Sequence, residues 1–220
     1  MFIPKIKICC ISTIREAELA IKYGASAIGL VSEMPSGPGV ISKELIKEIA
    51  SAVPPTVDTF LLTSEINAES IIAQHRKCNT STLQIVDRVN INVYDKLREE
   101  LPAIRLVQVI HVTDGDSVKE AVLVSKYVDA LLLDSGNQKL AIKELGGTGR
   151  THDWTISRKI RDAVSVPVYL AGGINAKNVL DAAKQVEPFG IDLCSGVREN
   201  GNLSENLLGE FFSLLHNSES

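Results

Sequence analysis

Short apolar runs alternate with amphipathic stretches along the whole chain, and this alternation limits the possible folds more than any other feature. Eight such runs have the length of buried strands, and a helical pattern follows each of them. Alternation of this kind indicates a parallel sheet with crossover helices. The expected strands are 6–11, 27–31, 58–62, 82–86, 104–112, 130–134, 166–171 and 190–194.

Eight strand–helix units that close on themselves form a (β/α)8 barrel, the TIM barrel. We therefore predict an α/β protein with one barrel domain over residues 1–220. The alternative is a doubly wound open sheet, which usually has fewer strands and a GxGxxG motif after the first. The sequence contains no such motif after residues 6–11.

Composition excludes several classes of partner. The net charge is −4 and no run of lysine or arginine is present, so we expect no nucleic acid and no membrane as a partner. The first ten residues, MFIPKIKICC, lack the apolar core of a signal peptide, and no apolar stretch reaches about 18 residues. These patterns predict a cytoplasmic protein.

The four cysteines and four histidines have no spacing typical of a metal site, so we expect no metal. Cys9 and Cys10 are adjacent, and a disulfide between neighbours would be strained. Free thiols in a reducing compartment are the expectation.

Cys9 is the first candidate for chemistry. Two-residue alternation in the first strand places Lys7, Cys9 and Ile11 on one face, and Ile6, Ile8 and Cys10 on the other. The second face is uniformly apolar and should contact the helices, so Cys9 should point into the barrel near the rim where barrel enzymes act. Such a cysteine is either a base or nucleophile, or a small buried apolar residue.

Asp134 is the second candidate, because it ends the run Leu131-Leu132-Leu133. Apolar walls raise the pKa of a carboxyl group and suit it to general-acid catalysis. The alternative is a loop or helix-cap aspartate. Cys9 and Asp134 together would form a base and acid pair on different strands.

Glycine-rich turns follow the last three expected strands. Glycine permits close approach of the backbone to a phosphate, and the backbone N–H groups supply donors. The loops after strands seven and eight are the usual phosphate site of a barrel. The turns are Gly146-Gly147-Thr148-Gly149, Gly172-Gly173 and Ser195-Gly196.

Together these strand ends resemble the phosphoribosylanthranilate isomerase family of tryptophan biosynthesis. The resemblance spans essentially the whole chain in order, and the combination is specific although no single motif is. The matching motifs are Lys7-Ile8-Cys9, Leu132-Leu133-Asp134-Ser135, Gly146-Gly147-Thr148-Gly149 with Asp153-Trp154, Leu170-Ala171-Gly172-Gly173-Ile174-Asn175 with Asn178-Val179, and Ile191-Asp192-Leu193-Cys194-Ser195-Gly196-Val197.

The resemblance implies an Amadori rearrangement of a small phosphoribosyl substrate, without cofactor or metal. It implies that Asp134 is the general acid on the ring oxygen and that Cys9 is the general base on the C2 proton. Such proteins occur as monomers and homodimers, and we expect one of these states. The resemblance also implies that the substrate phosphate contacts Gly147, Gly149, Gly172, Gly173, Ser195 and Gly196.

Most departures from the family pattern lie in the first half of the chain. Where the family carries an arginine for the anthranilate carboxylate, residues 34–39 read MPSGPG. The strand ends 61–63 and 84–87 also differ, Cys10 stands in place of a glycine, and Arg198 in place of a glutamate.

Three interpretations follow: an isomerase of phosphoribosylanthranilate, a paralogue for a different aglycone, or a non-catalytic barrel that binds a sugar phosphate. The loss of an arginine–carboxylate pair separates the first two. Arg88 and Arg198 are the candidates to replace the missing arginine.

Overall fold

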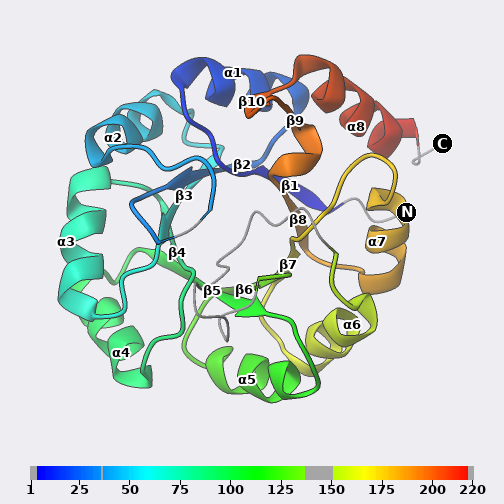
Figure 1. Ribbon diagram of the computed structural model, residues 1–220. Coiled ribbons are helices and arrows are strands. Elements are labelled where there is room, and N and C mark those ends of the chain that lie inside the picture. Colours follow the sequence, from blue (N-terminus) through cyan, green and yellow to red (C-terminus); the bar gives the residue numbers. More distant parts are fainter. Residues whose placement is uncertain (1–3, 36, 137–150, 218–220) are drawn as a thin grey trace.

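The protein was analysed as a computed structural model that describes residues 4–35, 37–136 and 151–217. Within these residues eight parallel strands follow one another in chain order and close into a barrel, because the last strand pairs with the first. The helices surround the barrel as an outer ring (Figure 1). The predicted (β/α)8 barrel is confirmed.

The strands and helices alternate as the sequence predicts. The barrel strands are β1 (Lys5–Ile8), β2 (Ala27–Val31), β3 (Asp58–Thr63), β4 (Thr82–Ile85), β5 (Arg105–His111), β6 (Ala130–Asp134), β7 (Val168–Leu170) and β8 (Gly190–Leu193). The helices are α1 (Ile14–Tyr23), α2 (Lys43–Ala52), α3 (Ala68–Cys78), α4 (Ile91–Glu100), α5 (Asp116–Val124), α6 (Trp154–Ala163), α7 (Val179–Val186) and α8 (Glu205–Asn217).

The strands separate two apolar clusters, because successive side chains of a strand point to opposite faces. The larger cluster fills the space between the barrel and its helices. The smaller cluster combines the inward side chains with rim residues that follow the strands, and it consists of Cys9, Cys10, Ala27, Val31, Phe60, Leu62, Val86, Val107, Val109, Ala130, Leu132, Tyr169 and Ala171.

The alternation predicted for the first strand fails after Cys9. β1 ends at Ile8, and Cys10 has a φ of 61°, in the left-handed region. This conformation reverses the direction of the side chains that follow. The prediction that Cys10 faces the helices is therefore wrong, because Cys10 belongs to the inner cluster. Ile11, expected inside, packs in the outer cluster.

The segment before α7 is a turn rather than the start of the helix. Here Asn175 to Asn178 form a turn, in which the Asn178 side chain accepts a hydrogen bond from the Asn175 backbone N–H. The helix begins only at Val179. A short hairpin of β9 (Arg198–Glu199) and β10 (Asn202–Leu203), not predicted from sequence, follows the 3-10 helix η1 (Ser195–Val197) after β8.

None of the helices in the described part of the chain has the length and hydropathy that a membrane crossing requires.

Comparison of a variant that keeps the Cβ of residue 10 with one that lacks it tests the left-handed conformation of Cys10. A residue with a Cβ in this region costs about 1–2 kcal/mol that glycine avoids. We expect Cys10→Gly to unfold with a free energy about 1 kcal/mol higher than Cys10→Ala in urea titrations, although both lack the thiol. Equal stability of the two variants would contradict the backbone conformation described here.

Candidate active site

A buried ion pair joins the first and last strands of the barrel. The register of β1 and β8 sets Lys7 opposite Asp192, and the Lys7 Nζ lies 2.8 Å from the Asp192 Oδ1. The Lys7 side chain is wholly buried and its ammonium lies 5.1 Å from the centre of the Phe60 ring. Burial lowers the pKa of Lys7, but the Asp192 carboxylate together with the Cys9 and Cys10 side chains raises it above its ordinary value.

Cys9 lies inside the barrel at the rim, as predicted, with 5% of its surface exposed. Its backbone N–H donates to the Leu193 carbonyl at 2.7 Å, which fixes it against the end of β8. Gly29 on β2 leaves the space that it needs: a Cβ there would lie 2.8 Å from the Cys9 sulfur and 3.0 Å from the Lys7 Nζ. The thiol and the ammonium therefore border the same small space.

Asp134 is the last residue of β6 and is buried. It lies beside His111 in the register of β5 and β6, and its Oδ1 accepts the Ser135 backbone N–H at 2.7 Å. Burial raises the pKa of Asp134, while His111, Ser135 and the Lys7 charge oppose the shift. The carboxyl group thus has the raised pKa that a general acid needs.

His111 ends β5, where it could either line a pocket or be held as a structural residue. Its Nε2 is hydrogen bonded to the Val86 carbonyl at 2.9 Å, whereas its buried Nδ1 has no hydrogen-bond partner. His111 is buried and also lines a cavity of about 770 Å³ at the ends of β4 and β5. It therefore fits both descriptions: one nitrogen is anchored and the ring reaches the cavity.

The turns after β6, β7 and β8 pack against one another in sequence. Gly172 and Gly173 have φ values of +84° and +65°. A Cβ on Gly172 would lie 2.9 Å from the Ser135 Oγ, next to Asp134. A Cβ on Gly196 would lie 2.0 Å from the Ile174 carbonyl oxygen, so only glycine fits there. The turn after β7 is thereby in contact with the turns on both sides.

Four of the six residues predicted to contact the phosphate lie in the described part of the chain. Gly147 and Gly149 lie outside the described residues. Gly172, Gly173, Ser195 and Gly196 all lie at the C-terminal ends of β7 and β8, where barrels bind phosphate. The Gly173 carbonyl accepts the side-chain amides of Asn175 and Asn178, at 3.2 and 3.0 Å, which holds the first turn in place.

Arg88 and Arg198, the candidates to replace the arginine that residues 34–39 lack, both form ion pairs within the chain. Arg198 pairs with the Glu16 carboxylate at 2.9 Å and donates to the Cys10 carbonyl at 2.6 Å. Arg88 pairs with Glu120 beside the cavity at β4 and β5. Each cation therefore already has a carboxylate partner.

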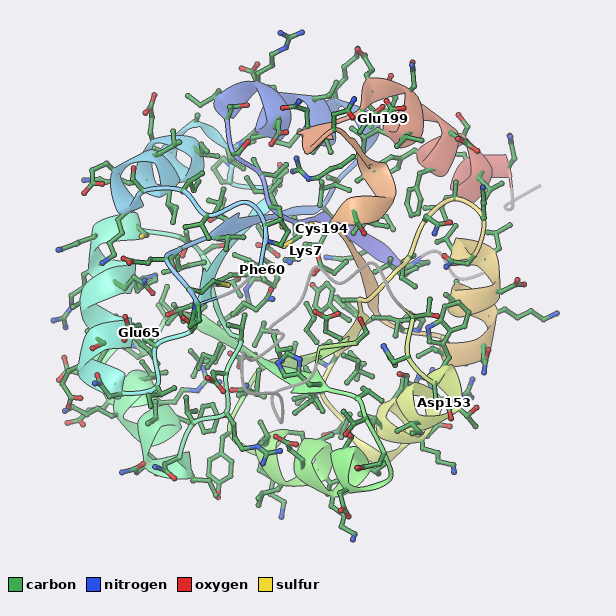
Figure 2. All side chains as sticks on the ribbon, in the orientation of Figure 1. Lys7, Phe60, Glu65, Asp153, Cys194 and Glu199 are labelled. Atoms are coloured by element: carbon green, nitrogen blue, oxygen red, sulfur yellow. The ribbon has the colours of Figure 1, made fainter. Side chains whose placement is uncertain are left out.

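Lys7 and Asp192 are site residues that sequence reasoning did not single out. Figure 2 shows Lys7, Phe60 and Cys194 toward the centre of the barrel, whereas Asp153 lies out at the start of α6. The sequence held a signal for this pair, because a closed barrel pairs its first and last strands, and Lys7 and Asp192 each stand between two apolar residues of those strands. Across the described residues, His, Cys, Asp and Glu side chains form no group of three or more that could hold a metal.

Comparison with known proteins agrees with the barrel and its strand ends. The family model for N-(5'-phosphoribosyl)anthranilate isomerase matches residues 6–213. The chain belongs to this family. Its members include the N-(5'-phosphoribosyl)anthranilate isomerase of Methanocella arvoryzae, 31% identical over 88% of each chain. The N-(5'-phosphoribosyl)anthranilate isomerase 2 of Methanosarcina mazei is 32% identical over 92% of this chain and 89% of its own.

A solved structure supports the fold of this isomerase family. It is phosphoribosyl anthranilate isomerase in complex with reduced 1-(o-carboxyphenylamino)-1-deoxyribulose 5-phosphate. The likeness covers 98% of this chain and 100% of that chain with a TM-score of 0.81, at 24% sequence identity.

Loss of the Lys7 charge should destabilise the barrel strongly. Lys7→Met keeps most of the length of the side chain but leaves the buried Asp192 carboxyl without its partner, which costs about 3–5 kcal/mol. The double variant Lys7→Met/Asp192→Leu should recover most of this loss, because it removes both charges. Urea unfolding of the three proteins measures the effect. A double variant as unstable as Lys7→Met would show that packing, not the unpaired charge, sets the loss.

Proposed function

We propose that this chain isomerises N-(5'-phosphoribosyl)anthranilate to the 1-deoxyribulose 5-phosphate product, the Amadori step of tryptophan biosynthesis. One observation carries the proposal: the buried Asp134 carboxyl, with its raised pKa, and the Cys9 thiol lie at the same rim of the barrel, where the Lys7 ammonium borders the thiol and acts electrostatically on the carboxyl. A general acid and a general base on opposite sides of one pocket are what the reaction requires.

Asp134 acts first in the proposed reaction. Its carboxyl donates a proton to the ring oxygen of the phosphoribosyl group, and the C1–O bond breaks. The lone pair of the substrate nitrogen forms a double bond to C1 as the ring opens. Burial raises the pKa of Asp134 and so favours the protonated form that donates this proton.

Cys9 then removes the proton from C2. The C2–H electrons form the C1–C2 double bond, and the imine electrons return to nitrogen, so the substrate itself accepts the charge. The resulting enol tautomerises to the ketone. The Lys7 ammonium borders the space that the Cys9 thiol faces.

The turns after β7 and β8 hold the phosphate in this proposal. Gly172, Gly173 and Gly196 allow backbone N–H groups to approach the anion, and the mutual packing of the turns fixes their positions. The cytoplasmic location and the monomeric or homodimeric state stay predictions.

A second candidate is the isomerisation of a phosphoribosyl amine with a different aglycone. The ion pairs of the two arginines favour this candidate. Arg88 already pairs with Glu120 and Arg198 with Glu16, so each cation that could bind the anthranilate carboxylate has a carboxylate partner within the chain. In both cases the phosphoribosyl half of the substrate and the roles of Cys9 and Asp134 are the same.

Substitution of the proposed acid and base tests the function. We expect Cys9→Ala and Asp134→Asn each to lower kcat by about 10²–10⁴-fold, because each removes one proton-transfer group. Cys78→Ala is the matched control, because Cys78 is a buried thiol of α3 in the outer cluster. The measurement is turnover of phosphoribosylanthranilate, with growth of a tryptophan auxotroph that lacks this isomerase as support.

The outcomes separate the candidates. Turnover by the wild type with loss in both variants supports the first candidate. A folded wild type that fails on phosphoribosylanthranilate, yet binds ribose 5-phosphate, favours the second candidate or a non-catalytic barrel that binds a sugar phosphate. Full activity of Cys9→Ala or Asp134→Asn would contradict the proposed roles.

The raised pKa of Asp134 predicts how stability depends on pH. The folded protein binds the Asp134 proton more tightly than the unfolded chain, so this group stabilises the fold at low pH. That stabilisation is lost as pH rises from the unfolded pKa, about 3.9, through the folded pKa. The asparagine side chain of Asp134→Asn does not titrate, so this pH-dependent change is absent from the variant.

The unfolding free energy of Asp134→Asn minus that of the wild type should therefore be larger at neutral pH than near pH 4. Urea titrations at a series of pH values measure this difference, and groups that titrate alike in both proteins cancel. A difference that does not change with pH would mean that the folded environment leaves the Asp134 pKa at its ordinary value.

A further inference from the structure

Three of the four thiols gather at the rim of the barrel. Cys9 and Cys10 follow β1, and Cys194 follows β8. The Cys10 and Cys194 sulfur atoms are hydrogen bonded at 2.8 Å, and Cys9 adjoins Cys10 in sequence and in the inner cluster. Figure 2 shows Cys194 close to the barrel axis, beside the label of Lys7.

The backbone brings Cys10 and Cys194 together from opposite ends of the chain. β1 and β8 are paired up to Ile8 and Leu193, so the next residues, Cys9 and Cys194, lie side by side and Cys10 follows directly. The positive φ of Cys10 then turns its side chain into the barrel, where an extended residue would face the helices. Arg198 holds this conformation through its hydrogen bond to the Cys10 carbonyl.

The two thiols differ in a way that suits stepwise oxidation. Cys194 is partly exposed, whereas Cys10 is buried. The hydrogen bond with Cys10 and the Arg198 guanidinium lower the pKa of Cys194, against the effect of burial. Hydrogen bonds with Cys194 and Cys9 raise the pKa of Cys10. Cys194 is thus the thiol that ionises first and meets an oxidant first.

We propose that Cys10 and Cys194 are a redox modification site, at which a peroxide forms a reversible disulfide that shuts down the catalytic rim. The Cys194 thiolate attacks one oxygen of hydrogen peroxide and breaks the O–O bond, which gives a sulfenic acid and releases water after proton uptake. The Cys10 sulfur attacks the Cys194 sulfur, the S–O bond breaks, and a second water leaves. Two thiols lose two electrons to one peroxide.

The disulfide would alter the site at two points. Bond formation brings the sulfur atoms from 2.8 Å to about 2.05 Å and imposes a fixed torsion between them. Cys10 is bonded to Cys9, and Cys194 to Ser195 of the turn proposed to hold the phosphate. The cross-link therefore acts on both the base and the phosphate turn, and activity should fall in proportion to the cross-linked fraction.

Hydrogen peroxide treatment of the purified chain, followed by thiol titration and peptide mass spectrometry, tests the proposal. We expect the titre to fall from four thiols to two and a Cys10–Cys194 peptide to appear. A reducing dithiol should restore both the titre and the activity. The thiol and peptide measurements need no activity assay, so the cross-link is tested separately from the proposed function.

Variants provide the controls, each compared with its own reduced state. Cys194→Ser should lose the cross-link and the reversible inactivation. Cys78→Ser should keep both, because burial raises the pKa of the Cys78 thiol to about 11 in the outer cluster. Oxidation at Cys9 alone, a Cys9–Cys10 peptide, or equal reversible inactivation of wild type and Cys194→Ser would overturn the proposal.

Discussion

The ion pair between Lys7 and Asp192 is the interaction on which the catalytic rim depends. It joins residues 185 positions apart and lies at the seam where β8 meets β1. Two charges removed from water are tolerated only if they pair. The pair therefore favours the register of β1 and β8 that sets Lys7 opposite Asp192 over registers shifted by one or more residues. That register also fixes the place of Cys9, whose N–H is bound to the Leu193 carbonyl.

Close packing of backbone builds much of the rest of the rim, together with Arg198, which pairs with Glu16 and holds the Cys10 carbonyl. Gly29 makes room for the Cys9 sulfur, Gly172 for Ser135, and Gly196 for the Ile174 carbonyl. Each absent Cβ lets one strand end approach the next. The proposed acid, base and phosphate turns therefore share a rigid frame, and the same proximity brings Cys10 to Cys194.

Much of this architecture could be predicted from local patterns. The alternation of strands and helices gave the barrel, and the acid after three leucines gave Asp134 at a strand end, where the structure has it. Local patterns did not predict the places where the backbone departs from regular strand or helix geometry. The left-handed φ of Cys10 placed Cys10 inside and Ile11 outside, and the Asn175–Asn178 turn delayed α7 to Val179.

The sequence by itself determined the number and order of the strand–helix units and the family, because periodicity and strand-end motifs are local properties of the chain. Only the tertiary structure decided that Lys7 pairs with Asp192, that Arg88 and Arg198 are committed to Glu120 and Glu16, and that Cys10 meets Cys194. These partners come from distant segments. Their contact depends on barrel register and on single backbone angles, which residue spacing does not specify.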